Sequence, residues 1–272
     1  MKISIIIVCF NAGNALIDTV NSVLKQTYDD YEVIIQDGVS TDGSLDALPN
    51  SDKISLYVEE DNGIYDAMNR AVKHISGSYV LFLNCGDYLY NSDTLSQVAN
   101  FLEGKDDKSI YYGDVFIKSR NGIVINPSSI NDYIMATRTI CHQSIIFPST
   151  LFDKYLYDYK RYPLAADYEL YCRCYKKENF KLVHMNFIVV SYDCTGVSET
   201  IENKKKIIIE KNSILKDICT ESEYKAIQIK RIYTLYFLKE KIGISKILQK
   251  PYQAISTIKS RILMAYSKLY QY

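Results

Sequence analysis

Tryptophan is absent from this sequence of 272 residues, and proline and glycine are scarce, with 5 and 11 copies. A chain that is 47% hydrophobic and poor in these residues is expected to be globular, with a sizeable core. No run of about 18 uncharged apolar residues occurs, so we expect no membrane-spanning helix. The apolar part of MKISIIIVCF is too short for a secretory signal and runs directly into a turn.

The seven cysteines include no C-x-x-C pair. An odd number of cysteines without this spacing favours reduced thiols in a cytosolic protein. Cys172 and Cys174 are one residue apart and would point to different sides of a strand or a helix. We therefore expect no metal site built on this pair.

Sequence motifs of several common enzyme classes are also missing. There is no G-x-G-x-x-G after the first apolar segment and no G-x-x-x-x-G-K-[ST], which argues against a dinucleotide-dependent dehydrogenase and a P-loop enzyme. Neither the G-x-S-x-G nucleophile elbow nor the H-E-x-x-H zinc motif occurs. The remaining candidates for chemistry are carboxylates in turns that follow apolar segments.

Charge is distributed unevenly, although the formal net charge is zero. Residues 201–272 contain 15 Lys and Arg against 6 Asp and Glu, a local charge of +9, which leaves −9 on residues 1–200. An acidic segment suits cation binding, and a basic tail suits an anionic surface. We expect a domain boundary near residue 200, where this composition changes.

The first part of the chain has the pattern of a βαβ unit. Residues 3–10 form a continuous apolar run rich in isoleucine, which is typical of a strand buried on both faces. Asn14 is the expected N-cap of a helix over residues 16–24, where apolar residues recur at helical spacing. Residues 31–36 form a second apolar strand that ends at Asp37. The two strands must be parallel, with a right-handed connection.

Further elements follow from the same periodicities. Residues 55–58 favour a short third strand, and residues 64–75 have the i, i+3, i+4, i+7 spacing of an amphipathic helix. The next strand is expected at residues 78–83. Residues 110–117 resemble an edge strand, and residues 168–177 are expected to be helical. Beyond residue 201, long helices with interleaved basic and apolar residues are expected.

Three turns should meet at one edge of the predicted sheet. Phe10 and Asn11 follow the first strand, and Asp37 and Gly38 follow the second. In YVLFLNCGDYLY, residues 84–87 follow the strand of the second unit. Ligands of open α/β sheets bind along the carboxyl edge of the parallel strands, so these turns predict a binding site rather than ordinary surface turns.

The run SIIIVCFNAGNALIDTVNSVLKQTYDDYEVIIQDGVSTDGS resembles the opening of family 2 glycosyltransferases with the GT-A fold. EEDNGIYDAMNRAVKHISGSYVLFLNCGD continues the family pattern, so the resemblance is dense over residues 1–90. It is thinner in CHQSIIF (141–147), LAADYELYCRC (164–174) and TGVS (195–198). The resemblance implies an α/β GT-A fold, with a mostly parallel central sheet flanked by helices and a C-terminal helical extension.

The resemblance also implies a site for a nucleotide-sugar donor. Phe10 and Asn11 would lie beside the base and the ribose, and Asp37 would contact the nucleoside. Asp61 and Arg70 match the middle segment of the pattern, where Arg70 would approach the diphosphate with a charge-assisted fork. Each residue also has a structural alternative. Phe10 would be a core aromatic at the end of its strand and Asn11 a turn residue. Asp37 would cap its loop, and Arg70 would be a solvated charge on its helix.

The family pattern is interrupted after Asp37. Many members have a second aspartate there, which usually contacts uracil, whereas this chain has Gly38. The base therefore stays open at this point, with a UDP-sugar expected first and a GDP- or dTDP-sugar as alternatives.

Asn84 and Asp87 match the family motif that binds a divalent metal. Departure of a nucleoside diphosphate develops negative charge on phosphate, and Mg²⁺ or Mn²⁺ held by an aspartate would neutralise it. Relatives usually have two acids here, whereas this chain has only Asp87, which would therefore be the main ligand. The soft thiol of Cys85 does not suit these metals and would only pack. His142 would help to hold the metal or the acceptor, with a structural histidine as the alternative.

Asp167 in AADYEL matches the family's catalytic base at the start of a helix. In an inverting transfer, a carboxylate takes the proton from the acceptor hydroxyl while that oxygen attacks the anomeric carbon. A helix N-terminus favours the ionised carboxylate. An N-cap is the alternative role for Asp167, and Glu169 is the alternative base.

The resemblance thus implies a metal-dependent, inverting hexosyl- or related glycosyltransferase of bacterial capsule, O-antigen or exopolysaccharide synthesis. Residues 1–200 would be the catalytic domain, with a donor half (1–90) and an acceptor half (91–200), and residues 201–272 a basic helical extension. The acceptor would be a glycan or a polyprenyl-linked molecule, and no binding to nucleic acid is expected. The protein would be cytoplasmic, and the extension would contact the inner membrane leaflet or pack on the domain or a second subunit.

Two other functions stay open at this point. A non-catalytic nucleotide-sugar-binding module would fit the loss of one acid from the metal motif. A sugar-1-phosphate nucleotidylyltransferase has a similar sheet, but it needs a Gly-rich basic loop after the first strand, and FNAGNA has no Lys or Arg.

Overall fold

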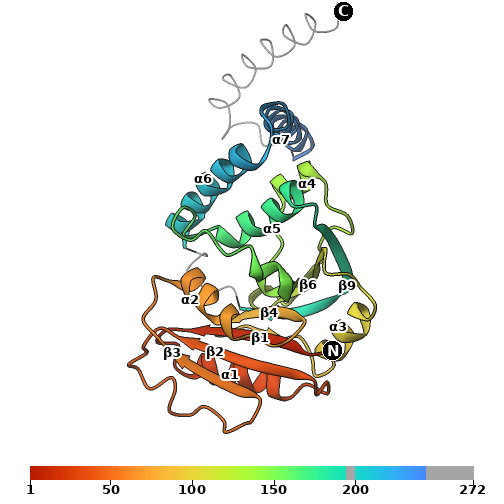
Figure 1. Ribbon diagram of the computed structural model, residues 1–272. Helices are drawn as coiled ribbons and strands as arrows, with labels where there is room; N and C mark the ends of the chain where they lie inside the picture. Colours follow the sequence, from red (N-terminus) through yellow and green to blue (C-terminus); the bar gives the residue numbers. More distant parts are fainter. Residues whose placement is uncertain (194–199, 243–272) are drawn as a thin grey trace, which may run out of the picture. The chain divides into compact units, whose positions relative to one another are not determined.

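The computed structural model describes residues 1–193 and 200–242 (Figure 1). The chain divides into two compact units, residues 1–219 and 220–272, so the helix α6 (Ile201–Ile218) belongs to the first unit. The segment TGVS at 195–198 lies outside the described residues. Among the helices of the described ranges, none is both long and apolar enough to span a lipid bilayer.

The first half of the sheet consists of four neighbouring parallel strands in the order β3-β2-β1-β4. Their bounds are Ile3–Cys9 for β1, Tyr31–Asp37 for β2, Ile54–Val58 for β3 and Tyr79–Asn84 for β4. The predicted βαβ pairing is therefore confirmed. The isoleucine-rich β1 lies between two neighbours and is buried along its full length, as its apolar sequence requires.

The second half of the sheet is mixed. Strand β8 (Ile145–Pro148) pairs antiparallel with β4 and with β6 (Ser109–Ile117), and β9 (Lys181–Tyr192) runs parallel to β6. The short β5 (Tyr88–Leu89) pairs antiparallel with β9, and β7 (Gly122–Val124) with β6. The expectation of an edge strand at residues 110–117 was wrong, because β6 is paired on both sides and is buried over most of its length.

The helices connect and cover these strands. In the first unit they are α1 (Asn14–Leu24), α2 (Ile64–Ala71), α3 (Thr94–Leu102), α4 (Asp132–Thr137), α5 (Ala166–Lys177) and α6, and the second unit contains α7 (Glu221–Ile242). Short 3₁₀ turns lie at Val72–His74, Lys118–Arg120, His142–Ser144 and Ser149–Asp153. Two boundaries differ from expectation. Gly13, with φ +53°, takes the N-cap position expected for Asn14, and α2 gives way to 3₁₀ geometry at Val72.

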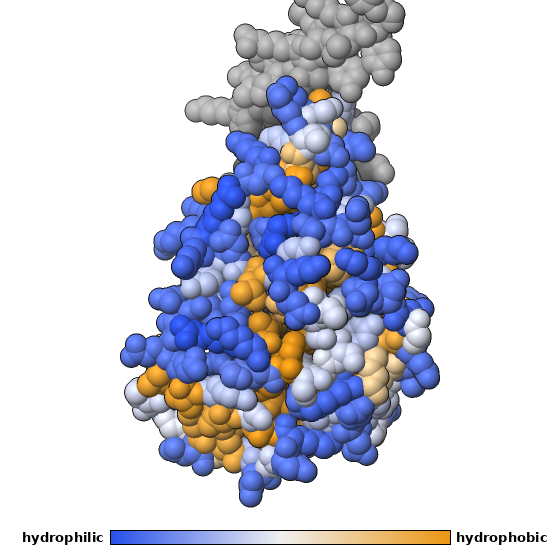
Figure 2. All heavy atoms as spheres, viewed as in Figure 1, coloured by the Kyte–Doolittle hydropathy of each residue, from blue (hydrophilic) through white to orange (hydrophobic). Residues whose placement is uncertain are grey.

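The core lies on both faces of the sheet, because successive side chains of a strand point to opposite faces. Ile3, Ile5 and Ile7 of β1 pack in one cluster with residues of α1 and α3. Figure 1 shows α2 on the other side of the same strands. Hydrophilic side chains cover much of the visible face in Figure 2, and an apolar area lies at its lower left, over the part of the sheet labelled β1–β3 in Figure 1.

Glu32 joins the beginnings of the parallel strands. Its carboxylate accepts hydrogen bonds from Ser4 Oγ at 2.6 Å, from the Ser76 backbone N–H at 2.6 Å and from Ser76 Oγ at 2.7 Å, and it pairs with Lys2 Nζ at 2.8 Å. Burial alone would raise the pKa of Glu32, but these donors together lower it to about 2. The ionised carboxylate therefore stabilises the end of the sheet opposite to the predicted site.

Candidate active site

The three predicted turns follow neighbouring strands. Because β2, β1 and β4 are adjacent and parallel, Asp37, the pair Phe10-Asn11 and residues 84–87 all lie at the same edge of the sheet. Phe10 is 65% exposed there, whereas Asp37 and Asp87 are buried. The sequence-based expectation that these turns converge is confirmed.

Asp37 organises the loop after β2. Its two carboxylate oxygens accept hydrogen bonds from the Ser40 backbone N–H at 2.7 Å and from Ser40 Oγ at 2.5 Å. Ser40 Oγ in turn accepts the Asn11 N–H at 2.8 Å, and Asn11 Oδ1 accepts the Thr41 N–H at 2.9 Å. Asn11 has a positive φ of 48°, which asparagine tolerates better than most residues. The two loops are thus fixed to each other at the sheet edge.

Asp87 is a buried carboxylate held by two donors from the second half of the chain. Its Oδ2 accepts a hydrogen bond from Gln143 Nε2 at 2.9 Å, and its Oδ1 accepts the Asp193 backbone N–H at 3.0 Å. Burial raises the pKa of Asp87 to about 6, and the nearby Lys118 acts in the opposite direction. Lys118 Nζ also donates to the Gly86 carbonyl at 2.8 Å, so positive charge lies close to the carboxylate.

Two further residues near Asp87 carry oxygen atoms suited to a divalent metal: Asn84, whose backbone carbonyl accepts the Asp87 N–H at 3.0 Å, and Asp193. Asn84 Oδ1 is buried and has no hydrogen-bond partner within the described residues. The Asp193 carboxylate lies close enough to raise the pKa of Asp87. These hard oxygen ligands fit Mg²⁺ or Mn²⁺ better than a soft metal. Over residues 1–193 and 200–242, however, no group of three His, Cys, Asp or Glu side chains is arranged to hold a metal ion.

Cys85 takes the packing role that the sequence suggests. Its thiol donates a hydrogen bond to the Val8 carbonyl at 3.3 Å, and its pKa is raised by its contact with Cys9 and by burial. Gly86 has a φ of +96°, a backbone conformation that favours glycine, and it positions Asp87 after the turn.

Asp167 lies in the first turn of α5, as predicted. The Tyr65 hydroxyl of α2 donates a hydrogen bond to Asp167 Oδ1 at 2.8 Å. Burial and the neighbouring Asp167 raise the pKa of Tyr65 well above its usual value, so Tyr65 stays a neutral donor. This contact joins the predicted base to a helix of the donor half.

Helix α6 supports the segment that carries Asp167. Glu210 Oε2 accepts the Leu164 backbone N–H at 3.0 Å, directly before α5. Lys211 Nζ lies 4.9 Å from the ring centroid of Tyr168 and hydrogen-bonds to Thr139 Oγ1. The beginning of the basic extension is therefore packed against the fold of the first unit.

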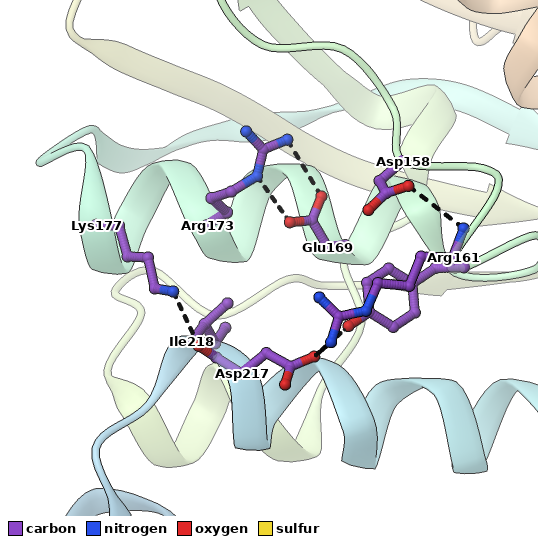
Figure 3. A pocket seen from close by; sticks show the side chains of 8 residues that line it. Asp158, Arg161, Glu169, Arg173, Lys177, Asp217 and Ile218 are labelled. Carbon is purple, nitrogen blue, oxygen red and sulfur yellow. Dashed lines mark hydrogen bonds and ion pairs between the residues drawn. The ribbon is translucent and has the colours of Figure 1, made fainter.

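Glu169, the alternative base, faces a different surface of α5. Its carboxylate binds Arg173 Nε at 2.7 Å and Arg173 Nη2 at 3.2 Å. Figure 3 shows this pair in a polar hollow of about 380 Å³ between α5 and α6. Arg161 pairs there with Asp217 at 2.6 Å. The arginine that binds Glu169 makes it a structural ion-pair residue rather than a free base.

His142 is buried among aromatic residues. Its Nε2 lies 2.9 Å from the Tyr157 hydroxyl, and its ring lies 5.1 Å from Phe82 and 6.0 Å from Phe147, measured between centroids. Burial lowers the pKa of His142, which favours the neutral imidazole. These surroundings are those of a core histidine, and it is the next residue, Gln143, that contacts Asp87.

The middle segment of the family pattern lies along α2. Arg70 Nη1 binds Glu59 at 3.0 Å and Arg70 Nη2 binds Asp66 at 3.4 Å, so its fork is engaged by two acids. Asp61 Oδ1 accepts the Gly63 N–H at 2.8 Å just before the helix. The diphosphate contact of Arg70 stays a prediction, and it would require the guanidinium to exchange these partners.

Four residues of the site were not singled out from the sequence. Tyr65 and Gln143 lie inside the segments GIYDAMN and CHQSIIF, so their place in the resemblance could have indicated them. Lys118 and Asp193 follow β6 and β9, and no motif marks them. Their proximity to Asp87 results from the pairing of strands that are distant in sequence.

Comparison with known proteins agrees with this architecture. The family model for glycosyl transferase family 2 matches residues 4–182. A PGL/p-HBAD biosynthesis glycosyltransferase of Mycobacterium bovis is 35% identical over 208 residues, which cover 74% of this chain and 81% of that protein. The chain therefore belongs to glycosyl transferase family 2, and its predicted GT-A fold is confirmed.

Two solved structures share this fold. The S. aureus TarS structure in complex with UDP-GlcNAc has a TM-score of 0.60 and 18% identity, over 84% of this chain and 70% of that chain. The mannosyltransferase PcManGT from Pyrobaculum calidifontis, in complex with GDP-Man and Mn²⁺, has a TM-score of 0.58 and 15% identity, over 98% of this chain and 86% of that chain.

Proposed function

We propose that this protein is an inverting glycosyltransferase of bacterial surface-polysaccharide synthesis. It transfers a sugar from a nucleoside-diphosphate sugar to a glycan or polyprenyl-linked acceptor. The observation that carries the proposal is the buried Asp87 carboxylate in the same turn as Asn84, whose buried Oδ1 has no hydrogen-bond partner among the described residues, because a cation with its diphosphate ligand would satisfy both groups. The relative named for PGL/p-HBAD biosynthesis and the complex of TarS with UDP-GlcNAc support the reaction class.

The donor is bound along the carboxyl edge of β1, β2 and β4. Phe10 provides an exposed ring for the base, while Asn11 and Asp37 shape the nucleoside loop. Asn84 and Asp87 face the diphosphate side. Mg²⁺ or Mn²⁺ bound at Asp87 would supply positive charge to the leaving nucleoside diphosphate. The contacts of His142 add no support for a role as a second ligand.

Asp167 acts as the base in the transfer. Its carboxylate accepts the proton of the acceptor hydroxyl while the hydroxyl oxygen bonds to the anomeric carbon. The bond between that carbon and the diphosphate oxygen breaks, and the configuration inverts. Tyr65 fixes the orientation of the carboxylate through its 2.8 Å hydrogen bond. The second carboxylate oxygen would then take the proton from the acceptor.

Contact of residues 201–272 with the inner membrane leaflet is part of the proposal, and a second subunit is the alternative. Ile201, Ile208 and Ile209 of α6 are exposed, and the basic residues 204–206 lie between them in sequence. Apolar and basic side chains together suit an anionic lipid surface. Sedimentation with anionic vesicles, but not with neutral ones, would support this contact, whereas a concentration-dependent dimer without vesicle binding would support the alternative.

A panel of nucleotide-sugars tests the proposed reaction. The full-length protein should bind a UDP-, dTDP- or GDP-sugar in calorimetry only with Mn²⁺ or Mg²⁺, and it should slowly hydrolyse the same donor. Nuclear magnetic resonance of the released sugar should first detect the inverted anomer. Absence of binding to every donor with either metal would contradict the proposal, and binding without any turnover would favour a non-catalytic module.

A further inference from the structure

Gly38 stands where a second acid is common, and the structure gives a reason for the glycine. A Cβ atom at this position would lie 2.6 Å from Asp61 Oδ2 and 3.3 Å from Cδ2 of the Phe10 ring. Both distances are shorter than ordinary contacts of a Cβ atom, and the first would force a displacement. Gly38 has no positive φ, so its backbone conformation does not call for glycine, and it is the close approach of Asp61 that disfavours a larger residue here.

The Asp61 carboxylate is held in this place with one oxygen available. Oδ1 accepts the Gly63 N–H at 2.8 Å, which fixes the side chain at the start of α2. Oδ2, the oxygen next to Gly38, has no hydrogen-bond partner within the described residues, and Asp61 is partly exposed. A fixed acceptor with access to solvent therefore lies beside the exposed ring of Phe10.

The other polar groups of this edge are already engaged. Asp37 is fully buried, and both of its carboxylate oxygens accept hydrogen bonds from Ser40. Asn11 Oδ1 accepts the Thr41 N–H at 2.9 Å. Among Asp37, Asn11 and Asp61, only Asp61 presents an acceptor without a partner in the described part of the chain, and it lies next to an aromatic ring.

We propose that Asp61 is the residue that selects the base of the donor, in the place that Gly38 leaves open. The base stacks on Phe10, and a ring N–H donates to Asp61 Oδ2. Uracil, thymine and guanine carry such a ring N–H at neutral pH. Cytosine and adenine donate only from an exocyclic amino group, which lies beside an unprotonated ring nitrogen whose lone pair would repel the carboxylate. The donor is therefore a UDP-, dTDP- or GDP-sugar rather than a CDP- or ADP-sugar. This inference rests on the proposed donor site.

Nucleoside diphosphates with Mn²⁺ test the inference on the full-length protein by calorimetry. Wild type should bind at least one of UDP, dTDP and GDP at least 10-fold more tightly than CDP and ADP. Asp61→Ala should weaken the preferred nucleotide by about 10- to 100-fold, because a charge-assisted hydrogen bond is lost. Asp61→Asn keeps the size of the side chain but offers an N–H, so it should reduce the preference over CDP. A purely structural role would weaken all nucleotides equally.

Moving the carboxylate from position 61 to position 38 gives a second test. Gly38→Asp should weaken binding, because its Cβ collides with the Asp61 carboxylate. The double variant Gly38→Asp/Asp61→Ala places a carboxylate in the same region from the other loop, and it should regain much of the lost preference for the N–H-bearing bases. Glu60→Ala removes an exposed charge from the same segment and should bind as wild type does.

The outcomes separate this inference from the proposed function. If no nucleoside diphosphate binds wild type, the donor site itself is wrong. If wild type binds nucleotides but does not distinguish UDP, dTDP or GDP from CDP and ADP, or if Asp61→Ala and Asp61→Asn keep the wild-type preference, Asp61 does not select the base while the donor site stands. Thermal melting of each variant identifies an unfolded one, and Asp61→Asn then remains the decisive variant because it preserves side-chain shape.

Discussion

The two halves of the first unit contribute to the site in different ways. In residues 1–90, Asn11, Asp37 and Asp87 lie at or shortly after the carboxyl ends of β1, β2 and β4, and Tyr65 and Arg70 lie on the single helix α2. In residues 91–193, the contributing side chains come from a 3₁₀ turn, a strand end and a helix that are distant from one another in sequence. Gln143 and Asp193 nevertheless meet at the same carboxylate, Asp87.

This difference follows from sheet topology. Parallel strands joined by helices place all their carboxyl ends at one edge, so short motifs suffice to build the first half of a site. Antiparallel and mixed pairing, as for β8 and β9, imposes no such rule on the direction of strand ends. The donor half should therefore control nucleotide binding, and the second half should control transfer. Substitutions at Asp167, Asp87, Tyr65 and Glu32 test this division.

The largest effect is expected at the base. Asp167→Asn should reduce turnover by about 10²- to 10⁴-fold, the usual contribution of general base catalysis, while donor binding stays within about 2-fold. Activity is measured as release of nucleoside diphosphate with the acceptor, and binding by calorimetry. Glu169→Gln is the matched control, because Glu169 is paired with Arg173. Near-normal turnover of Asp167→Asn, with a large loss in Glu169→Gln, would assign the base to Glu169.

Asp87→Asn tests the metal role that we propose for this carboxylate in donor binding. Loss of the carboxylate should weaken metal-dependent donor binding by about 100-fold. Binding to wild type should also weaken as the pH falls below about 6, where the carboxyl group becomes protonated. Asp193→Asn removes a neighbouring charge but leaves Asp87 intact, so its metal-dependent donor binding should be weakened less than that of Asp87→Asn. Unchanged donor affinity of Asp87→Asn in calorimetry would reject the metal role.

The same substitution should stabilise the metal-free protein. The folded-state pKa of Asp87, about 6, lies above its ordinary value of 3.8. Folded protein thus binds more protons than unfolded protein in this range, and stability falls as the pH rises from about 4 to about 6. Asp87→Asn lacks this loss, so its free energy of unfolding at pH 8 should exceed that of wild type by about 1–2 kcal/mol. Urea unfolding of both proteins in metal-free buffer at pH 4 and pH 8 measures the difference, which should be larger at pH 8.

Tyr65→Phe tests the contact between the two halves. Removal of the hydroxyl takes away the donor that holds the Asp167 carboxylate in one orientation. Turnover at neutral pH should fall by about 3- to 10-fold, with unchanged donor affinity. Tyr155→Phe removes a hydroxyl that bonds to Glu178 outside the site, and its turnover should match wild type. Unchanged turnover of Tyr65→Phe, or an equal loss in Tyr155→Phe, would contradict positioning by Tyr65.

The smallest effect is expected at the opposite end of the parallel strands. Glu32→Gln should lower stability by about 1–2 kcal/mol at pH 7, since water screens part of the interaction, and should leave activity unchanged. The pKa of Glu32 is depressed to about 2, so wild type should lose this advantage as the pH falls from about 4.5 towards 2. Asp30→Asn changes an exposed pair with the amino terminus and should cost no more than a few tenths of a kcal/mol.

The parallel half of the sheet was predictable from the sequence because its signals are local. The isoleucine run of β1, the turn after β2 and the strand before Asp87 each appear in a few consecutive residues. The position of Asp167 at the start of α5 was likewise predictable from its motif. The interior position of β6 was not, because its pairing with β8 and β9 depends on segments more than 30 residues away in sequence.

The sequence by itself determined the family, the parallel half of the sheet and the acids at its edge, because periodicity and turn residues act over short distances. Only the tertiary structure decided which groups surround those acids. It placed Gln143 and Asp193 on Asp87, Tyr65 on Asp167, and Asp61 in the space above Gly38. The physical reason is that such contacts depend on how strands and helices far apart in sequence pack together, which no local pattern encodes.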